Sequence, residues 1–245
     1  MAKIKKRLDI KVHELVPEYD IKYIQSWIMQ GKVRVGDRII TKPGTLIADD
    51  MVITHSIKQQ KYVSRAGLKL ERALEYFEID VTDLIVLDAG ISTGGFTDCL
   101  LQHGAKKVYG VDVGYGDVHN KIRNDPRLIL LEKTNLRLLE KLDELVDLIT
   151  LDLSFISIIN VMPSVCKLLK QKGQLIVLIK PQFEAAKNQI EGGGIVRDND
   201  LRQKIVTSVV DRIIEYGFEC IGIIESPIEG TKGNKEFLGY FKRNA

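Results

Sequence analysis

Residues 84–98, LIVLDAGISTGGFTD, form the stretch that decides the fold. Four apolar residues open it, as is typical of a buried parallel strand, and apolar residues return at helical spacing after the glycines. The pattern therefore predicts a strand, a glycine-rich turn and a helix. Glycines in such a turn let a ligand approach the backbone and the first amides of the helix. On this stretch alone, an ordinary strand-to-helix turn of an α/β protein is the alternative.

The turn lacks two common nucleotide-binding motifs. The dinucleotide fingerprint G-x-G-x-x-G is absent, because the next glycine after Gly90 comes only at Gly94. The phosphate loop is absent as well, because Gly94 and Gly95 run into Phe96 without a lysine. The pattern therefore favours a nucleoside ligand that carries no phosphates.

Acidic residues end two successive predicted strands. Asp88 closes the first, and Asp112 closes a strand over residues 108–112, about 20 residues later, where an acid reaches ribose hydroxyls. A nucleoside with a cationic tail fits best, which predicts S-adenosylmethionine as the cofactor. Asp112 would bind its ribose, and the glycine turn with Asp88 would bind its amino-acid end. Thr134 and Asn135 lie at the carboxyl end of a third predicted strand and are expected to join this site. The expected cofactor-binding residues are therefore Asp88, Gly90, Ser92, Thr93, Gly94, Gly95, Phe96, Asp112, Thr134 and Asn135.

The composition describes a globular chain, with 44% apolar and 28% charged residues among 245. The longest apolar runs hold about five residues, far from the roughly 20 that cross a bilayer, which argues against a membrane-spanning pore. Three scattered cysteines, an odd number, indicate reduced thiols and a cytoplasmic protein. The four histidines are equally dispersed, so no metal site is expected.

Positive charge is concentrated in the first quarter of the chain. Residues 1–62 hold 12 Lys and Arg against 7 Asp and Glu, a net charge of +5. The remainder holds 24 against 26, a net charge of −2. Such a distribution predicts a module that binds a polyanion, followed by a nearly neutral catalytic body.

The chain divides by composition into two domains and a linker. The basic first part predicts a small α+β domain, and polar residues separate it from the helix that opens the second part. The predicted boundaries are residues 1–55 for the first domain, 56–63 for the linker and 64–245 for the second domain. A run of glycines at residues 192–194 is expected to form a mobile loop that closes over substrate.

The first domain is expected to hold two helices and a small sheet. Helical periodicity covers residues 4–15 and a segment from Asp20 to near Gly31. A hairpin around Gly36 and a strand over residues 52–54 follow.

Two sequences in this domain, RLD at residues 7–9 and WIMQGKVRVG at residues 27–36, resemble the alpha-L RNA-binding domain of a ribosomal protein. The chain departs from that domain at the second helix, where a Ser-Arg pair is usual and DIK stands at residues 20–22. A solvated basic surface is the alternative to RNA binding. The resemblance implies RNA contacts from Lys6, Arg7, Lys22, Lys32, Arg34 and, beyond the linker, Arg65.

The second domain alternates strands and helices, which predicts a doubly wound α/β sheet with one antiparallel element at its edge. Its opening helix carries Lys69 beside an apolar stripe. Asp152 and Lys180 end two neighbouring strands on one edge of the sheet, where α/β proteins bind ligands. Glu236 begins the last predicted strand.

Six motifs follow one another along the chain, at residues 64–70, 88–98, 112–116, 152–155, 180–184 and 233–238. In this order they resemble the TlyA family of S-adenosylmethionine-dependent ribosomal RNA 2′-O-methyltransferases, which are related to FtsJ-type enzymes. The resemblance implies a Rossmann-like class I methyltransferase sheet and ribosomal RNA or a ribosomal subunit as the partner. It also implies a cytidine of 23S rRNA as the target, with one of 16S rRNA as a second. The chain departs from the family at residues 117–120, where apolar residues and a tryptophan are more usual.

The resemblance further implies a catalytic tetrad of Lys69, Asp152, Lys180 and Glu236. A ribose hydroxyl is a poor nucleophile near neutral pH, so a base must remove its proton, and Lys180 is the candidate. A cation such as Lys69 would favour the neutral amine of Lys180, whereas Asp152 and Glu236 would favour the ammonium form. Positioning of the hydroxyl is expected to contribute more than the base.

Three other functions stay open at this point. A non-catalytic RNA-binding or ribosome-assembly factor could keep this fold, although the acids and glycines of the cofactor site speak against it. A base-methylating enzyme could use the same cofactor, but no catalytic cysteine stands near the fourth strand. Some family members are labelled membrane-active hemolysins, which the short apolar runs disfavour. No obligate protein partner is indicated.

Overall fold

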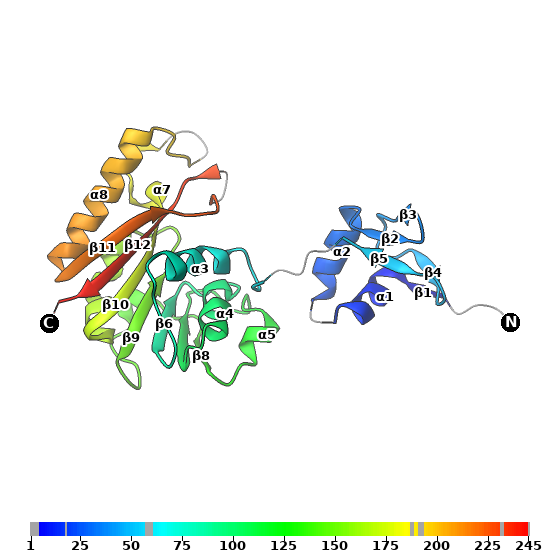
Figure 1. Ribbon diagram of the computed structural model, residues 1–245, viewed down its shortest axis with the longest axis horizontal. Helices are drawn as coiled ribbons and strands as arrows, with labels where there is room; N and C mark the ends of the chain where they lie inside the picture. Colours follow the sequence, from blue (N-terminus) through cyan, green and yellow to red (C-terminus); the bar gives the residue numbers. More distant parts are fainter. Residues whose placement is uncertain are drawn as a thin grey trace. The chain divides into compact units, whose positions relative to one another are not determined.

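The computed structural model describes residues 5–17, 19–56, 61–186, 189–190, 194–230 and 233–244. By its internal contacts the chain separates into two compact units, Met1–Gln59 and Gln60–Ala245 (Figure 1). Two predictions lie partly outside the described residues, namely the linker at residues 57–60 and the glycine loop at residues 192–193. No helix within the described ranges combines the length and the apolar character needed to span a membrane.

The first unit packs two helices against short antiparallel strands. Its elements are β1 (Lys5–Arg7), α1 (Leu8–Leu15), α2 (Ile21–Met29), β2 (Val33–Val35), β3 (Arg38–Ile39), β4 (Leu46–Ala48) and β5 (Ile53–His55). Strand β2 lies between β3 and β5, and β1 pairs with β4. Apolar residues at helical spacing meet inward-facing strand residues in a core that includes Leu8, Val12, Ile24, Ile28, Val33 and Ile47. The predicted second helix and hairpin are confirmed.

The prediction of a helix over residues 4–15 was wrong at its start, because the described part of this stretch opens as strand β1. Lys5–Arg7 pairs with Leu46–Ala48, which lies far along the chain, so local periodicity does not reveal the pairing. Arg7 is extended, with φ −65° and ψ 142°, and its guanidinium binds the buried carboxylate of Asp9 at 2.7 and 3.0 Å. Helix α1 begins at the next residue, Leu8.

The second unit is built on a seven-stranded sheet in the order β11-β12-β10-β9-β6-β7-β8. The strands are β6 (Ile85–Ala89), β7 (Lys107–Val111), β8 (Leu128–Leu131), β9 (Val146–Leu151), β10 (Leu169–Ile179), β11 (Phe218–Glu225) and β12 (Phe237–Arg243). Neighbours from β10 to β8 are parallel, and β12 is antiparallel to β10 and β11. The predicted antiparallel strand therefore exists, but it lies inside the sheet and not at its edge. Residues 237–241 are buried, as suits a strand covered on both faces.

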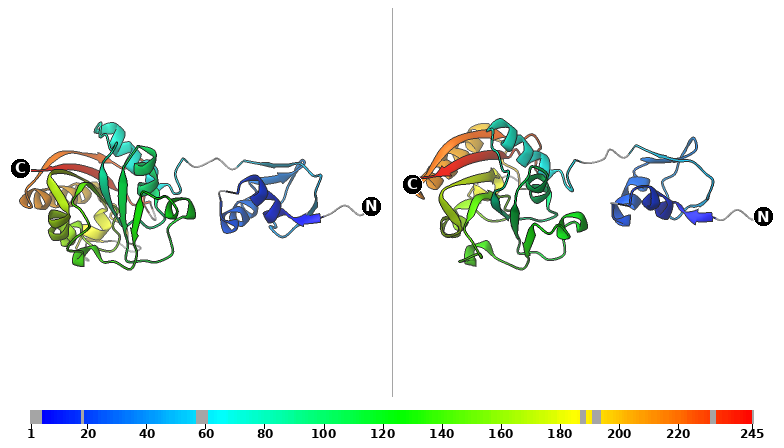
Figure 2. Two further views of the ribbon diagram at one scale, coloured as in Figure 1. Left: turned by 90° about the horizontal axis from the view of Figure 1, so that it is seen from below. Right: turned by 60° about the horizontal axis from the view of Figure 1, so that its bottom comes forward.

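Helices cover both faces of this sheet (Figure 2). The helices and 3₁₀ turns are α3 (Ala66–Tyr76), α4 (Gly95–Gln102), α5 (Asn120–Arg123), η1 (Leu136–Leu138), η2 (Ile158–Val161), α6 (Met162–Leu168), α7 (Pro181–Glu184) and α8 (Asn199–Glu215). Because side chains alternate along a strand, Val86 and Leu87 enter separate cores. Val86 belongs to the core with α3 and α4, and Leu87 to the core with α6 and α8. The predicted doubly wound α/β sheet is confirmed.

The second unit begins before the predicted boundary at Ser64. Tyr62 is 2% exposed, and its hydroxyl donates to Glu71 at 2.8 Å. The amide of Val63 donates to Asp98 of α4 at 2.9 Å. Tyr62 and Val63, which the sequence assigned to the linker, therefore belong to the second unit. A single aromatic residue in a polar stretch was the only signal for this.

Candidate active site

Two adjacent pockets open at the carboxyl edge of the parallel strands, where α/β proteins bind ligands. Each has a volume of about 400 Å³. Charged and polar side chains dominate the first pocket, and apolar side chains dominate the second. The two share Gly90, Ser92, Asp152 and Ser154, so a ligand in one pocket can reach the other.

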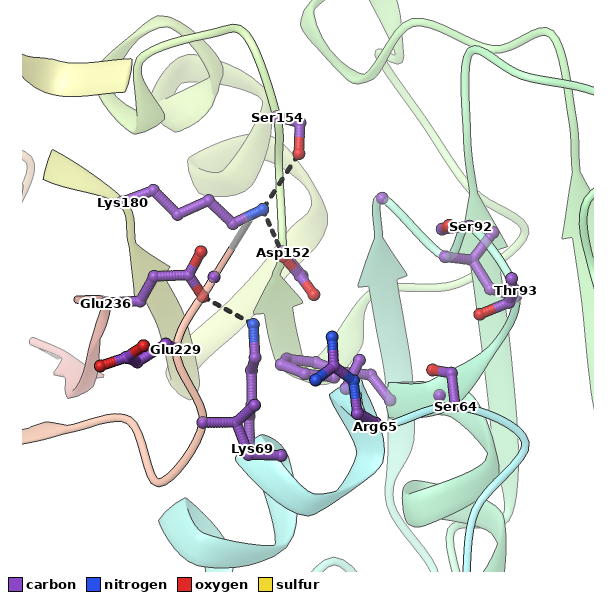
Figure 3. A pocket seen from close by; sticks show the side chains of 17 residues that line it. Ser64, Arg65, Lys69, Ser92, Thr93, Asp152, Ser154, Lys180, Glu229 and Glu236 are labelled. Atoms are coloured by element: carbon purple, nitrogen blue, oxygen red, sulfur yellow. Dashed lines mark hydrogen bonds and ion pairs between the residues drawn. The ribbon is translucent and has the colours of Figure 1, made fainter. Parts of the chain in front are cut away.

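Two ion pairs lie in the first pocket (Figure 3). The Nζ atom of Lys180, directly after β10, lies 2.7 Å from Oδ1 of Asp152, directly after β9, and donates to Oγ of Ser154 at 3.0 Å. The Nζ atom of Lys69 on α3 lies 2.6 Å from Oε2 of Glu236, directly before β12. Lys180 is 8% exposed and Glu236 3%, so each charge is compensated where water has little access. The structure thus brings the four residues of the expected tetrad into one pocket.

The first pocket holds two further charged side chains, Arg65 and Glu229. Among the residues that the structure describes, neither has an ion-pair partner within 4.0 Å. Figure 3 shows them on opposite sides of Lys69. The described ranges contain no group of three or more His, Cys, Asp or Glu residues that could hold a metal ion.

The second pocket joins apolar walls to a group of acceptors. Asp112, directly after β7, accepts hydrogen bonds from the amides of Ser92 and Gly114, both at 2.8 Å. Each of its carboxylate oxygens keeps a lone pair for a further donor. Thr134 and Asn135 line the same pocket. The apolar walls include Val111, Val113, Leu136, Leu153, Phe155, Ile156 and Val161. Such a pocket suits a base with an attached ribose.

The turn after β6 requires glycine at position 90. Gly90 has φ +84°, and a Cβ at this position would lie 2.5 Å from the carbonyl oxygen of Asp152. Its amide donates to the carbonyl of Val111 at 2.8 Å, so the turn is tied to both neighbouring strands. Gly94 lines neither pocket and instead precedes α4 with φ +94°. The other predicted residues of the turn line the first pocket, namely Ser92, Thr93, Gly95 and Phe96.

Asp88 lines neither pocket, contrary to the expectation that it binds the amino-acid end of the cofactor. Its carboxylate is fully buried and accepts hydrogen bonds from the hydroxyls of Thr97 at 2.6 Å and Thr150 at 2.9 Å. Burial raises the pKa of Asp88 to about 6. This side chain therefore joins β6 to α4 and β9, and it supports the glycine turn from within the core.

Asp88→Asn is expected to change how stability depends on pH. The pKa of Asp88 lies above the 3.8 of an exposed carboxyl, so folding favours the neutral form. The stabilisation from protonated Asp88 is fully present below about pH 4 and is lost as the pH rises through about 6. Asparagine stays neutral, so between these limits the variant should gain on the order of 3 kcal/mol in unfolding free energy relative to the wild type. Urea unfolding at about pH 4.5 and about pH 7.5 measures this difference.

Asp80→Asn is the control of opposite sign for this measurement. Asp80 is exposed, and its hydrogen bonds from Thr82 lower its pKa. The stabilisation from its carboxylate is therefore fully present above the unfolded pKa of 3.8, so the control variant should be less stable than the wild type by the same amount at both pH values. A pH-independent difference between wild type and Asp88→Asn would contradict the assignment of Asp88 as a buried titrating group.

Sequence reasoning missed the contacts that join the loops after β9 and β10. Phe155 is 90% exposed with φ +64°, and its ring packs against Phe183 with a centroid separation of 5.0 Å. Glu184 accepts hydrogen bonds from the hydroxyl of Ser157 at 2.6 Å and from the amide of Ile158 at 2.8 Å. These contacts brace the two loops that carry the first ion pair. The motif KPQFE contains Phe183 and Glu184, but its pattern does not reveal their partners.

The residues expected to contact RNA lie in both units, five in the first and Arg65 in the first pocket of the second. Lys6 and Arg7 are already paired with carboxylates of α1. Asp20 accepts a hydrogen bond from the amide of Lys22 at 2.8 Å, so it caps α2 at the position where the alpha-L domain, which this sequence resembles, usually carries serine. In the described part of the chain, three of the five have no ion-pair partner within 4.0 Å, namely Lys22, Lys32 and Arg34.

The sheet has helices on both faces, a pocket at its carboxyl edge and one antiparallel strand, β12, between β10 and β11. This arrangement defines a class I methyltransferase fold. Solved S-adenosylmethionine-dependent methyltransferases share this fold. The chain belongs to the FtsJ-like methyltransferase family, whose model matches residues 62–243. The predicted Rossmann-like fold is therefore confirmed.

Three similar proteins cover most of the chain. Hemolysin A of Brachyspira hyodysenteriae is 43% identical over 238 residues, which are 96% of this chain and 99% of that protein. A 16S/23S rRNA (cytidine-2′-O)-methyltransferase TlyA of Mycobacterium tuberculosis is 42% identical over 211 residues, 85% of this chain and 79% of that protein. The solved structure of a candidate hemolysin from Streptococcus thermophilus is 38% identical, with a TM-score of 0.75 and coverage of 99% of this chain and 90% of that chain. The resemblance to the TlyA family is confirmed.

Proposed function

We propose that this protein transfers a methyl group from S-adenosylmethionine to the ribose 2′-oxygen of a cytidine in ribosomal RNA, and that it does so in the cytoplasm. One observation carries the proposal. The ion pair of Lys180 and Asp152 lies in the first pocket, and Asp152 also lines the second pocket. A hydroxyl held at this junction is next to both the amine and a cofactor in the second pocket.

The residues of both pockets fit S-adenosylmethionine. Apolar walls in the second pocket suit adenine, and the free lone pairs of Asp112 suit ribose hydroxyls. In the first pocket, Oγ of Ser64 is buried beside Gly95 without a hydrogen-bond partner among the described residues. A buried unpaired hydroxyl is costly, and the amino-acid end of the cofactor offers it a partner. The bound cofactor supplies an electrophilic methyl group.

The tetrad can hold a ribose 2′-hydroxyl and take its proton. Lys180 is fixed by contacts with Asp152 and Ser154, and the pair of Lys69 and Glu236 adds no net charge to the pocket. In the proposed reaction, Lys180 first loses a proton to solvent, its amine then receives the proton of the 2′-hydroxyl, and Asp152 stabilises the ammonium ion that forms again. Holding the hydroxyl in a reactive position provides most of the rate enhancement.

Two grounds support ribosomal RNA as the substrate. The Mycobacterium relative is named as an enzyme for cytidines of 16S and 23S rRNA. The first unit also presents Lys22, Lys32 and Arg34 with no ion-pair partner among the described residues, as a phosphate-binding surface requires. In this proposal, residues 1–55 act as an alpha-L type RNA-binding domain for the methyltransferase domain.

RNA binding by the full-length protein is expected to weaken steeply as salt is added, because phosphate contacts release counterions. The double variant Lys22→Gln, Arg34→Gln should reduce the slope of log K against log salt by about 1.4 to 1.8. Lys204→Gln, at an exposed lysine of α8 in the second unit, is the control and should keep the wild-type slope. Fluorescence anisotropy with a labelled ribosomal RNA fragment measures the slopes. Equal slopes in all three proteins would refute phosphate binding by the first unit.

Mapping of methylation on ribosomal RNA tests the reaction itself. Ribosomal subunits that lack the modification are incubated with the protein and labelled S-adenosylmethionine. The product should resist alkaline cleavage after one cytidine, because a 2′-O-methyl group removes the attacking hydroxyl. A methyl group on a base would identify a base methyltransferase, and failure to bind S-adenosylmethionine in calorimetry would identify a non-catalytic RNA-binding factor. Lysis of erythrocytes by the purified protein would support the hemolysin alternative.

A further inference from the structure

The first pocket contains one carboxylate that the proposed reaction leaves unused. Its other acids belong to the two ion pairs, whereas Glu229 has no cation within 4.0 Å among the described residues. Figure 3 shows Glu229 on the side of the Lys69 and Glu236 pair that lies away from Ser92 and Thr93 of the glycine turn. Glu229 is therefore placed in the part of the pocket that the cofactor turn leaves to the substrate.

The backbone around Glu229 is held against the tetrad. The amide of Ser226 donates to the carbonyl of Glu236 at 2.8 Å, and the amide of Gly230 donates to the carbonyl of Asn234 at 2.8 Å. Gly230 also lies directly against the carboxylate of Glu236, because a Cβ at this position would collide with it unless that side chain moved. Residues on both sides of Glu229 are thus fixed next to one of the two ion pairs, and the exposed side chain of Glu229 projects from this fixed backbone.

We propose that the carboxylate of Glu229 accepts a hydrogen bond from the exocyclic amine of the target base, and that it thereby selects cytidine over uridine. The inference rests on the proposed function, because it states which base that site prefers. Cytosine presents the N4 amine, a donor, where uracil presents the O4 acceptor. A carboxylate offers only lone pairs, so it attracts the first and repels the second.

The size of the discrimination follows from the unpaired groups. Uracil would place two acceptors opposite each other and leave both without a donor, which is expected to reduce kcat/KM by about tenfold or more. In Glu229→Gln, the carboxamide offers both a donor and an acceptor, so it serves either base. In Glu229→Ala, neither base has a partner. The side chain of Glu229 is exposed, so both variants are expected to fold.

Ribosomal subunits reconstituted with cytidine or uridine at the mapped target nucleotide test the inference. The wild-type enzyme should prefer cytidine by about tenfold or more in kcat/KM, and the preference should fall to within about threefold in both Glu229 variants. Glu225→Gln is the matched control. Glu225 ends β11 on the same segment and pairs with Lys235 at 2.9 Å, so its variant loses the same charge and should keep the wild-type preference.

The outcomes separate this inference from the proposed function. A wild-type preference in both Glu229 variants would overturn the inference and leave 2′-O-methylation standing. Equal methylation of both templates by the wild-type enzyme would do the same. A wild-type protein that methylates neither template would overturn the proposed function and the inference together.

Discussion

Lys180→Ala is expected to lower the rate of methyl transfer by about 10²–10⁴-fold, the usual contribution of a positioned acid or base. The affinity for S-adenosylmethionine should stay near that of the wild type, because Lys180 does not line the second pocket, which is proposed to hold the adenosine, and its amine in the first pocket already contacts Asp152 and Ser154. Single-turnover kinetics on ribosomal subunits measure the rate, and calorimetry measures the affinity. Circular dichroism checks that the variant is folded after Asp152 has lost its partner at 2.7 Å.

A second lysine of the same sheet provides the matched control. Lys170 of β10 lies 2.7 Å from Asp147 of β9, so it joins the same two strands through the same kind of ion pair. Lys170 lines neither pocket, and Lys170→Ala should keep the wild-type rate.

Lys180→Arg separates charge from proton transfer, because arginine keeps the positive charge and does not give up its proton. Equal losses in the alanine and arginine variants would support Lys180 as the base. Wild-type turnover in Lys180→Ala would remove Lys180 from the mechanism altogether.

One physical rule was enough to predict from the sequence that two residues of the candidate site lie close together. Asp152 and Lys180 each follow an apolar strand, and parallel strands present their carboxyl ends at a common edge. The structure places their charged atoms 2.7 Å apart. This rule could not predict that Lys69 and Glu236 belong to the site, because a lysine on a helix is normally exposed and the start of a last strand has no fixed place in a sheet. Only the family resemblance named these two residues.

The same rule failed where the side-chain partners lie outside the local pattern. Asp88 and Asp112 end successive strands, and both were expected to face the cofactor. Asp88 instead meets the hydroxyls of Thr97 on α4 and Thr150 on β9, which nothing in the sequence aligns with it. Strand β12 was misplaced for a related reason, since its antiparallel direction follows from a short connection but its position depends on pairing with β10.

Gly90→Ala is expected to cause a large loss of both stability and cofactor binding. A side chain at φ +84° carries strain of about 1–2 kcal/mol. The added Cβ would also lie 2.5 Å from the carbonyl oxygen of Asp152, so the backbone that carries this acid must move. We therefore expect a total loss of about 3–4 kcal/mol in unfolding free energy and a fall of about tenfold or more in the affinity for S-adenosylmethionine. Urea unfolding and calorimetry measure the two effects.

Gly116→Ala separates backbone strain from the collision. Gly116 has φ +82°, but a Cβ there would have nothing within 4 Å, so its variant carries the strain alone. It should lose about 1 kcal/mol and keep the wild-type affinity for S-adenosylmethionine. The difference between the two variants then measures the contact between the glycine turn and the strand end at Asp152. If both variants lost equal stability and both kept their affinity, that contact would have no part in holding the cofactor. The two pockets could then not be treated as one active site.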